Sequence, residues 1–170
     1  SHLEVLVQII TGSSSFVQNL TKSVMKVGIQ IDGIVFSPMA AGEAVLNRDE
    51  KNVGIILIDI GAGTTDVSVF QGGHMRNAWA IPVGGKHVDN DIAVRFGISH
   101  KEAERVKVEY GRTYLDGRDE GDPVELHHVG GHDKTQVPKG MICQIIQPRI
   151  GELLGMVRAD LEENMPSAVM

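Results

Sequence analysis

A chain of 170 residues with 22 acidic and 16 basic side chains has a net charge of −6, so it offers no positive field for a phosphate backbone, and we expect no nucleic-acid partner. Its hydrophobic fraction of 42% is enough for one core or two small ones. The single cysteine, Cys143, excludes an intramolecular disulfide and a cysteine-built metal site, which is consistent with a reducing cytosol.

The first quarter of the chain predicts a βαβ unit. Residues 3–10 and 31–36 are apolar runs typical of strands, and between them Ser13 to Ser15 offer an N-cap for a helix that Gly28 ends. Strands joined by a helical crossover are parallel neighbours, so we expect both runs in one sheet. Pro38 then starts a second helix at its favoured first turn.

Residues 53–70 predict a strand, a tight turn and a second strand. The turn contains Gly61 and Gly63, which we expect to adopt positive φ and to let an anion approach the backbone. Successive N–H groups from Gly61 through Ala62 to Thr64 can then cradle phosphate oxygens.

The side chains around this turn extend the same interpretation. Thr64 and Thr65 add hydroxyl donors, and Asp59 and Asp66 lie on either side of the turn. Carboxylates beside a phosphate cradle require a cation or a reacting water between them and the nucleotide, which implies Mg²⁺.

A meander and two helices are expected next. A turn at residues 71–73 leads into a strand at 75–82, and Gly84-Gly85 then precede a helix that Gly97 ends. Paired glycines at a helix start can point N–H groups at a phosphate, or they can be an ordinary turn, and the sequence leaves both open. Ser99 and Glu102 form a capping-box pattern for the following helix.

The composition changes from Thr113 onward. A charged loop at 116–123 precedes an alternating strand at 124–129 and a turn at 130–134. A long apolar stripe predicts a helix from about Lys139 to Asn164, and Pro148 inside it predicts a bend.

The pattern from Asp59 to Asp66, Asp-x-Gly-x-Gly-Thr-Thr-Asp between two strands, resembles the second phosphate-binding loop of the actin, sugar-kinase and heat-shock chaperone superfamily. Later motifs, in order, make the whole chain similar to the bacterial cell-division FtsA family: Asn90–Ala93, Phe96-Gly97, Ala103–Val108, Val129–Gly131, Pro148-Arg149 and Glu152–Leu154.

The resemblance implies an α/β, actin-like ATPase (ribonuclease H-like) fold. We expect it to be incomplete in this fragment, which starts at Ser1-His2 without an initiator methionine, and to include a small α+β outer subdomain. The implied parts are the end of domain I with a hinge helix at 1–52, the core of domain II at 53–112, and its outer subdomain at 113–170.

The resemblance also implies ATP and Mg²⁺ as cofactors and assigns their residues. Asp59 would face Mg²⁺ through water and is the candidate catalytic and metal residue. Glu104 and Lys107 would lie near ribose and base. Ser37 stands where relatives that hydrolyse ATP well carry Glu or Gln, so we expect at most slow ATP hydrolysis. The candidate nucleotide-binding residues are Gly61, Ala62, Gly63, Thr64, Thr65, Asp66, Gly84, Gly85, Glu104 and Lys107.

The implied function is that of an actin-like cell-division protein that polymerises and tethers the FtsZ ring to the inner membrane. Expected partners are the FtsZ C-terminal peptide at Lys139 and Arg149, further copies of the protein and other divisome proteins. The expected location is the cytoplasmic face of the inner membrane at the division site, with membrane contact only through a segment absent here. The alternatives are an ATPase or kinase enzyme of the same superfamily and a pilus-assembly actin homologue.

Overall fold

The computed structural model describes residues 2–4, 7, 9–114, 117, 120–128 and 134–165. The chain divides into two compact units, residues 1–46 and residues 47–170, which we describe separately. None of the helices in these described ranges is long and apolar enough to cross a membrane.

The first unit contains the two predicted helices. Helix α1 spans Ser14–Lys26, and the side chain of Ser13 caps it by accepting a hydrogen bond from the N–H of Phe16 at 3.4 Å. Gly28 follows the helix with a φ of 79°, a conformation that favours glycine. Helix α2 spans Ser37–Val45 and has Pro38 in its first turn, as predicted.

The two strands predicted in this unit are absent from its described residues. The described residues of 3–10 and all of 31–36 lack strand structure. Their side chains lie largely in solvent, with Leu3 87% and Val35 69% exposed. A parallel pair is stable only when both of its faces are covered, and α1 has no buried residue with which to cover one. The apolar pattern therefore lacks the packing that would turn it into a sheet.

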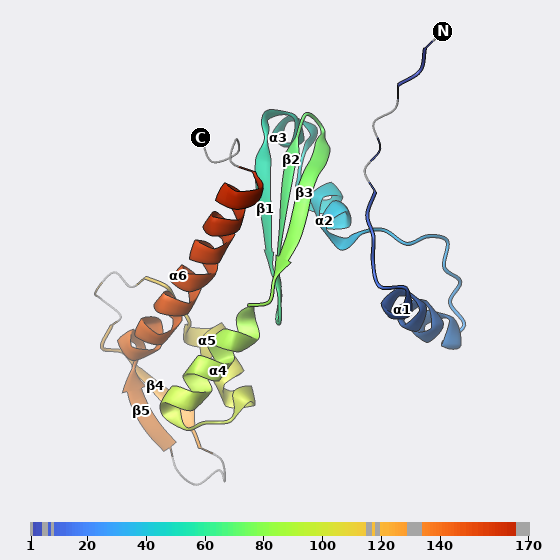
Figure 1. The fold of residues 1–170 in the computed structure, drawn as a ribbon. Helices are drawn as coiled ribbons and strands as arrows, with labels where there is room; N and C mark the ends of the chain where they lie inside the picture. The colour runs from blue at the N-terminus through green and yellow to red at the C-terminus, as the bar shows by residue number, and fades with distance from the viewer. Residues whose placement is uncertain are drawn as a thin grey trace. The chain divides into compact units, whose positions relative to one another are not determined.

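The second unit begins with a short helix and a three-stranded antiparallel sheet in the order β1-β2-β3 (Figure 1). This confirms the predicted meander. The turn between β2 and β3 caps the C-terminus of the short helix. The N–H groups of Gly72 and Gly73 donate to the carbonyls of Asn52 and Lys51 in its last turn, at 3.2 and 3.1 Å. The elements are α3 (Arg48–Val53), β1 (Ile55–Ile60), β2 (Thr65–Gln71) and β3 (His74–Ile81).

In the part of the chain that the structure describes, the rest of the second unit is three helices and a two-stranded hairpin. Its elements are α4 (Gly85–Phe96), α5 (His100–Tyr110), β4 (Pro123–His127), β5 (Lys134–Pro138) and α6 (Lys139–Asn164). Strand β5, antiparallel to β4, is not among the predicted elements, because five residues after a charged turn give too short a pattern to stand out from the helix that follows.

The capping box predicted at the start of α5 forms only in part. Ser99 accepts a hydrogen bond from the N–H of Glu102 at 3.2 Å, as expected. The carboxylate of Glu102 does not bond back to Ser99 but accepts hydrogen bonds from Arg105 and from the backbone N–H of His127 on β4. The hydrogen bonds from Arg105 lower the pKa of Glu102 to about 2. Glu102 thus links the β4–β5 hairpin to α5 through its hydrogen bond with His127.

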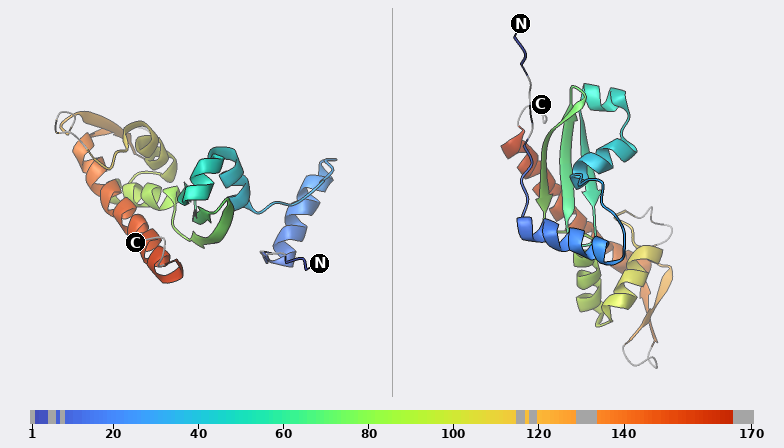
Figure 2. Two further views of the ribbon diagram at one scale, coloured as in Figure 1. Left: turned by 90° about the horizontal axis from the view of Figure 1, so that it is seen from above. Right: turned by 90° about the vertical axis from the view of Figure 1, so that its right-hand side faces the viewer.

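Helix α6 takes part in two hydrophobic cores. Its first half, with Ile142 and Ile146, packs into a cluster with α4, α5 and the β4–β5 hairpin. Its second half, with Leu153 and Val157, packs against one face of the three-stranded sheet (Figure 2). Val67 on that face is fully buried. Pro148 lies between the two halves. One helix therefore joins the sheet to the outer helices.

Candidate functional site

The turn between β1 and β2, residues 61–64, is stabilised by one internal hydrogen bond, from the N–H of Gly61 to the carbonyl of Thr64 at 2.9 Å. Within the described residues, the N–H groups of Ala62, Gly63 and Thr64 donate to no other group. Backbone donors must find a partner in protein, water or ligand. Three consecutive unbonded N–H groups at an exposed turn form a potential anion cradle.

The first turn of α4 holds this turn in place. The N–H of Gly85 donates to the carbonyl of Gly61 at 2.9 Å, and the N–H of Lys86 donates to the carbonyl of Ala62 at 2.8 Å. In a trans peptide the N–H points opposite to the carbonyl, and no peptide bond of the described chain is cis. The N–H groups of Ala62 and Gly63 therefore point away from α4.

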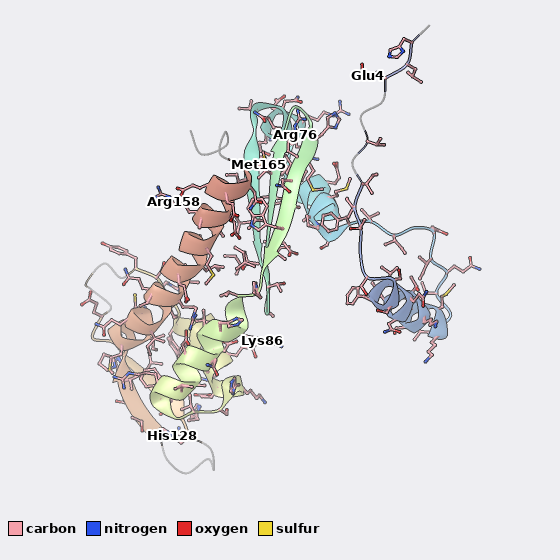
Figure 3. The ribbon with its side chains drawn as sticks, viewed as in Figure 1. Glu4, Arg76, Lys86, His128, Arg158 and Met165 are labelled. Atoms are coloured by element: carbon pink, nitrogen blue, oxygen red, sulfur yellow. The ribbon has the colours of Figure 1, made fainter. Side chains whose placement is uncertain are left out.

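These bonds show how the amides after Gly84 are used in this structure, and the predicted role of Gly84 and Gly85 in nucleotide binding stays a prediction. The amides at the start of α4 are occupied by carbonyls of the turn rather than directed at an anion. Glycine is required at position 84 because a Cβ there would lie 2.5 Å from the carbonyl oxygen of Gly61. Gly84 and Gly85 thus position the turn, and Figure 3 labels Lys86 beside them at the start of α4.

The expected positive φ at Gly61 and Gly63 is wrong, because neither residue lies in that region. A Cβ at Gly61 would lie 3.0 Å from the carbonyl oxygen of Thr64, whereas a Cβ at Gly63 would meet nothing within 4 Å. Close approach of backbone, rather than a left-handed conformation, is what favours glycine at 61.

The two threonines of the turn differ in position. Thr64 is exposed at the turn, but Thr65 is fully buried and its hydroxyl donates to the carbonyl of Val83 at 2.8 Å. Thr65 therefore ties β2 to the segment that leads into α4, and its hydroxyl is directed into the protein.

Asp59 and Asp66 are direct cross-strand partners at the ends of β1 and β2. Residues paired in this way project from the same face of a sheet, and like charges there destabilise the pair unless a cation lies nearby. Both are carboxylates, the ligand type that Mg²⁺ prefers. Among the described residues, no group of three or more His, Cys, Asp or Glu side chains could hold a metal ion by itself.

Lys107 of α5 lies next to the start of α4. Its ammonium group is 2.8 Å from Oδ1 of the buried Asp89 and donates to the carbonyl of Gly85 at 3.3 Å. Lys107 and Gly85 also line a hollow of about 380 Å³ between α4, α5 and α6, together with Val88, Gly111, Arg112, Thr113, Ile146 and Ile150. The side chain of Glu104 is exposed and is not part of this lining.

The two expected partner-binding residues lie at different points of α6. Lys139 is its first residue, and its backbone N–H donates to the carbonyl of Asp122 at 2.9 Å. Arg149 forms a bidentate ion pair with Asp91 of α4, with Nε–Oδ2 and Nη2–Oδ1 distances of 2.7 and 3.0 Å, and a second pair with Glu152. The carboxylate of Asp91 raises the pKa of Arg149. The predicted role of either residue in partner binding stays a prediction.

Asp89 and Asp91 are positions whose roles the sequence does not reveal. Both lie on α4, and Asp91 falls within the Asn90–Ala93 motif, but nothing in their spacing points to Lys107 or Arg149, which are far along the chain. Only the packing of α4 against α5 and α6 brings these charges together.

Comparison with known structures identifies the fold class of this chain. The chain resembles MreB5 of Spiroplasma citri bound to ADP with a TM-score of 0.72 and 23% identity, over 93% of this chain and 50% of that one. It also resembles the ethanolamine utilization protein EutJ from Carboxydothermus hydrogenoformans, with a TM-score of 0.64 and 20% identity, over 89% of this chain and 44% of that one. The fold is therefore that of the actin-like ATPases, and this chain forms only a part of that fold.

Sequence comparison identifies the family. Residues 56–167 match the family model for cell division protein FtsA. The chain is 40% identical to cell division protein FtsA of Bacillus subtilis over 159 residues, which are 94% of this chain and 36% of that protein. It is 34% identical to the Escherichia coli protein of the same name over 161 residues, 94% of this chain and 38% of that protein. The chain belongs to the FtsA family and spans less than two fifths of the length of these relatives.

Gly84→Ala tests the contact between α4 and the turn. A Cβ 2.5 Å from a backbone oxygen forces α4 and the turn apart, so we expect a loss of about 1–3 kcal/mol in the free energy of unfolding. Gly63→Ala is the matched control, because its Cβ would meet nothing within 4 Å, and we expect a change within about 0.5 kcal/mol. Urea unfolding followed by the fluorescence of Trp79, the only tryptophan, measures both. Equal stability of the two variants would contradict the contact.

Proposed function

We propose that the protein of which this chain is a part binds ATP with Mg²⁺ at the turn 61–64. The observation that carries the proposal is the set of unbonded N–H groups at Ala62, Gly63 and Thr64, of which the first two point away from α4. Phosphate oxygens are the acceptors that such a row of backbone donors fits. The structures of MreB5 bound to ADP and to AMPPNP, which share this fold, support the assignment.

The neighbouring residues fit the rest of such a ligand. Asp59 and Asp66 would hold Mg²⁺, in part through water, and the ion would offset both their mutual repulsion and the charge of the phosphates. Lys107 and Gly85, which line the hollow beside α4, would contact the sugar or base. Glu104, exposed on the same helix as Lys107, is the further candidate for that part of the ligand.

We further propose that the intact protein is an FtsA-type actin-like protein that forms filaments and tethers FtsZ at the cytoplasmic face of the inner membrane. Membership of the FtsA family supports this proposal. The C-terminal peptide of FtsZ would bind at Lys139 and Arg149, other divisome proteins would bind elsewhere, and residues 1–52, 53–112 and 113–170 would form the end of domain I, the core of domain II and its outer subdomain.

Asp59→Asn tests the nucleotide site in the full-length protein. Removing one carboxylate takes away a ligand position for Mg²⁺, so we expect the magnesium-dependent affinity for a fluorescent ATP analogue to fall about tenfold or more. Asp49→Asn, an exposed carboxylate on α3, is the matched control and should leave the affinity unchanged. Equal affinities of wild type and Asp59→Asn, with and without Mg²⁺, would refute the assignment.

The second prediction concerns the rate of hydrolysis. Ser37, at the first position of α2, is too short to orient an attacking water as Glu or Gln does, and a positioned general base supplies about 10²–10⁴-fold in rate. We therefore expect phosphate release by the full-length protein to be far below the turnover of about 10 per second that is typical of enzymes. Sustained turnover near that value would show that another residue positions the water.

The third prediction concerns the peptide. A charge-assisted pair with a peptide carboxylate contributes about 1.5–3 kcal/mol, so Lys139→Gln and Arg149→Gln should each weaken binding of a labelled FtsZ C-terminal peptide about ten- to a hundredfold. Arg158→Gln is the control, because Arg158 is 77% exposed on the same helix (Figure 3) and its ion pair is with Glu162, one turn away. Fluorescence anisotropy gives the affinities. If all three variants bind like wild type, the peptide docks elsewhere.

A further inference from the structure

Helix α4 is the element on which the position of the phosphate-binding turn depends. Its first two N–H groups, at Gly85 and Lys86, bond to the carbonyls of Gly61 and Ala62. A displacement or rotation of α4 would therefore either break these bonds or carry the turn with it. Whatever fixes α4 also fixes the direction of the unbonded N–H groups of the turn.

Two kinds of contact hold α4. The first is apolar packing in the outer core, which is the cluster formed by α4, α5, the β4–β5 hairpin and the first half of α6. It buries Val88, Ile92 and Ala93 and keeps the helix against its neighbours, but hydrophobic attraction itself is not directional. A hydrogen-bonded ion pair is directional, and Asp91 forms such a pair with Arg149 of α6. Asp89 is in ionic contact with Lys107 of α5 at 2.8 Å, without the geometry of a hydrogen bond.

The two ion pairs act on different sides of α4. Residues two positions apart on a helix are separated by about 200° and do not face each other. Asp89 and Asp91 therefore anchor α4 to α5 on one side and to α6 on another. Among the ion pairs of the described ranges, the one between Asp91 and Arg149 is the pair that joins α4 to α6.

The pair between Asp91 and Arg149 also completes a closed path of contacts. Beyond Arg149, Leu153 and Val157 of α6 pack against Val67 of β2, the strand that follows the turn. The path leads from the turn through α4 to α6, and through the sheet back to the turn. Pro148 precedes Arg149 and lacks the N–H that would bond within the helix, so α6 is weakest at the point where the pair anchors it.

We propose that Asp91 and Arg149 are positioning residues for nucleotide binding: their bidentate ion pair fixes α4 on α6, and α4 in turn fixes the N–H groups of the turn 61–64. This inference rests on the proposed binding of ATP at that turn. The pair has the geometry for such a role, since two parallel hydrogen bonds at 2.7 and 3.0 Å define an orientation as well as a distance.

The test uses the full-length protein and the variant Asp91→Asn, which removes the charge of the pair but keeps the shape of the side chain. Asp91 is the better position to change, because Arg149 is also a candidate for peptide binding. We expect the affinity for the magnesium complex of a fluorescent ATP analogue to fall about fivefold or more. Arg149→Lys, which keeps the charge but loses the bidentate geometry, should give a smaller loss than Asp91→Asn.

Glu152→Gln is the matched control. Glu152 is the other carboxylate bound to Arg149, but it lies on α6 itself, so its loss does not release α4. We expect this variant to bind the nucleotide like wild type. An equal loss of affinity in Glu152→Gln and Asp91→Asn would show a general effect of charge near α6 and would overturn the proposal.

Hydrogen–deuterium exchange separates positioning from a general loss of stability. In Asp91→Asn we expect faster exchange at the amides of Gly85 and Lys86, with unchanged protection at buried core positions such as Ile142. Unchanged exchange at Gly85 and Lys86, or faster exchange throughout the core, would overturn the inference. If the wild type itself does not bind the nucleotide, the proposed function fails, and exchange alone then decides whether the pair positions the turn.

Discussion

Two backbone hydrogen bonds, from the N–H groups of Gly85 and Lys86 to the carbonyls of Gly61 and Ala62, determine the structure of the candidate site. The first N–H groups of a helix have no partner within the helix and must be satisfied elsewhere. Here the turn satisfies two of them with its carbonyls. Because each peptide unit is planar, the same bonds turn the N–H groups of the turn toward the opposite side. A helix start and a hairpin turn thus produce a row of free donors that neither would present alone.

The second unit combines this local arrangement with two cores that share α6. The half of α6 before Pro148 belongs to the outer core with α4 and α5, and the half after it covers the sheet that carries the turn. Burial of apolar surface gives most of the stability of both cores and selects the face that each helix turns inward. The bidentate hydrogen bonds between Asp91 and Arg149 add a directional restraint to α4, and the ionic contact of Asp89 with Lys107 adds an attraction to α5.

Much of this fold can be predicted from the sequence, because the relevant signals are local. The caps at Ser13 and Ser99, the proline of α2 and the three strands of the meander all appear in the structure where the pattern places them. The strands predicted at 3–10 and 31–36 are absent from the described residues, because a parallel pair depends on covering layers that the first unit does not supply.

The candidate site shows the same division between local and tertiary information. The motif from Asp59 to Asp66 locates the turn, and the cross-strand pairing of these two carboxylates follows from the hairpin itself. The burial of Thr65 and the partners of Asp91 and Arg149 depend on how β2, α4 and α6 pack, and no spacing in the sequence encodes this. The motif therefore identifies the site but does not separate residues that line it from residues that support it.

The distinction between lining and supporting residues indicates which side chains of the site can affect ligand binding. The cradle consists of backbone N–H groups, so the side chain of Ala62 contributes nothing to it directly, and a Cβ at Gly63 would have open space around it. The strict requirement falls on Gly84, which is outside the turn, because any side chain there would collide with the carbonyl of Gly61. When backbone N–H groups bind the anion, the residues that must be conserved in size are therefore those that hold the backbone in place, here Gly84. For this reason α4 and its ion pairs, as much as the turn itself, determine whether the site can bind a ligand.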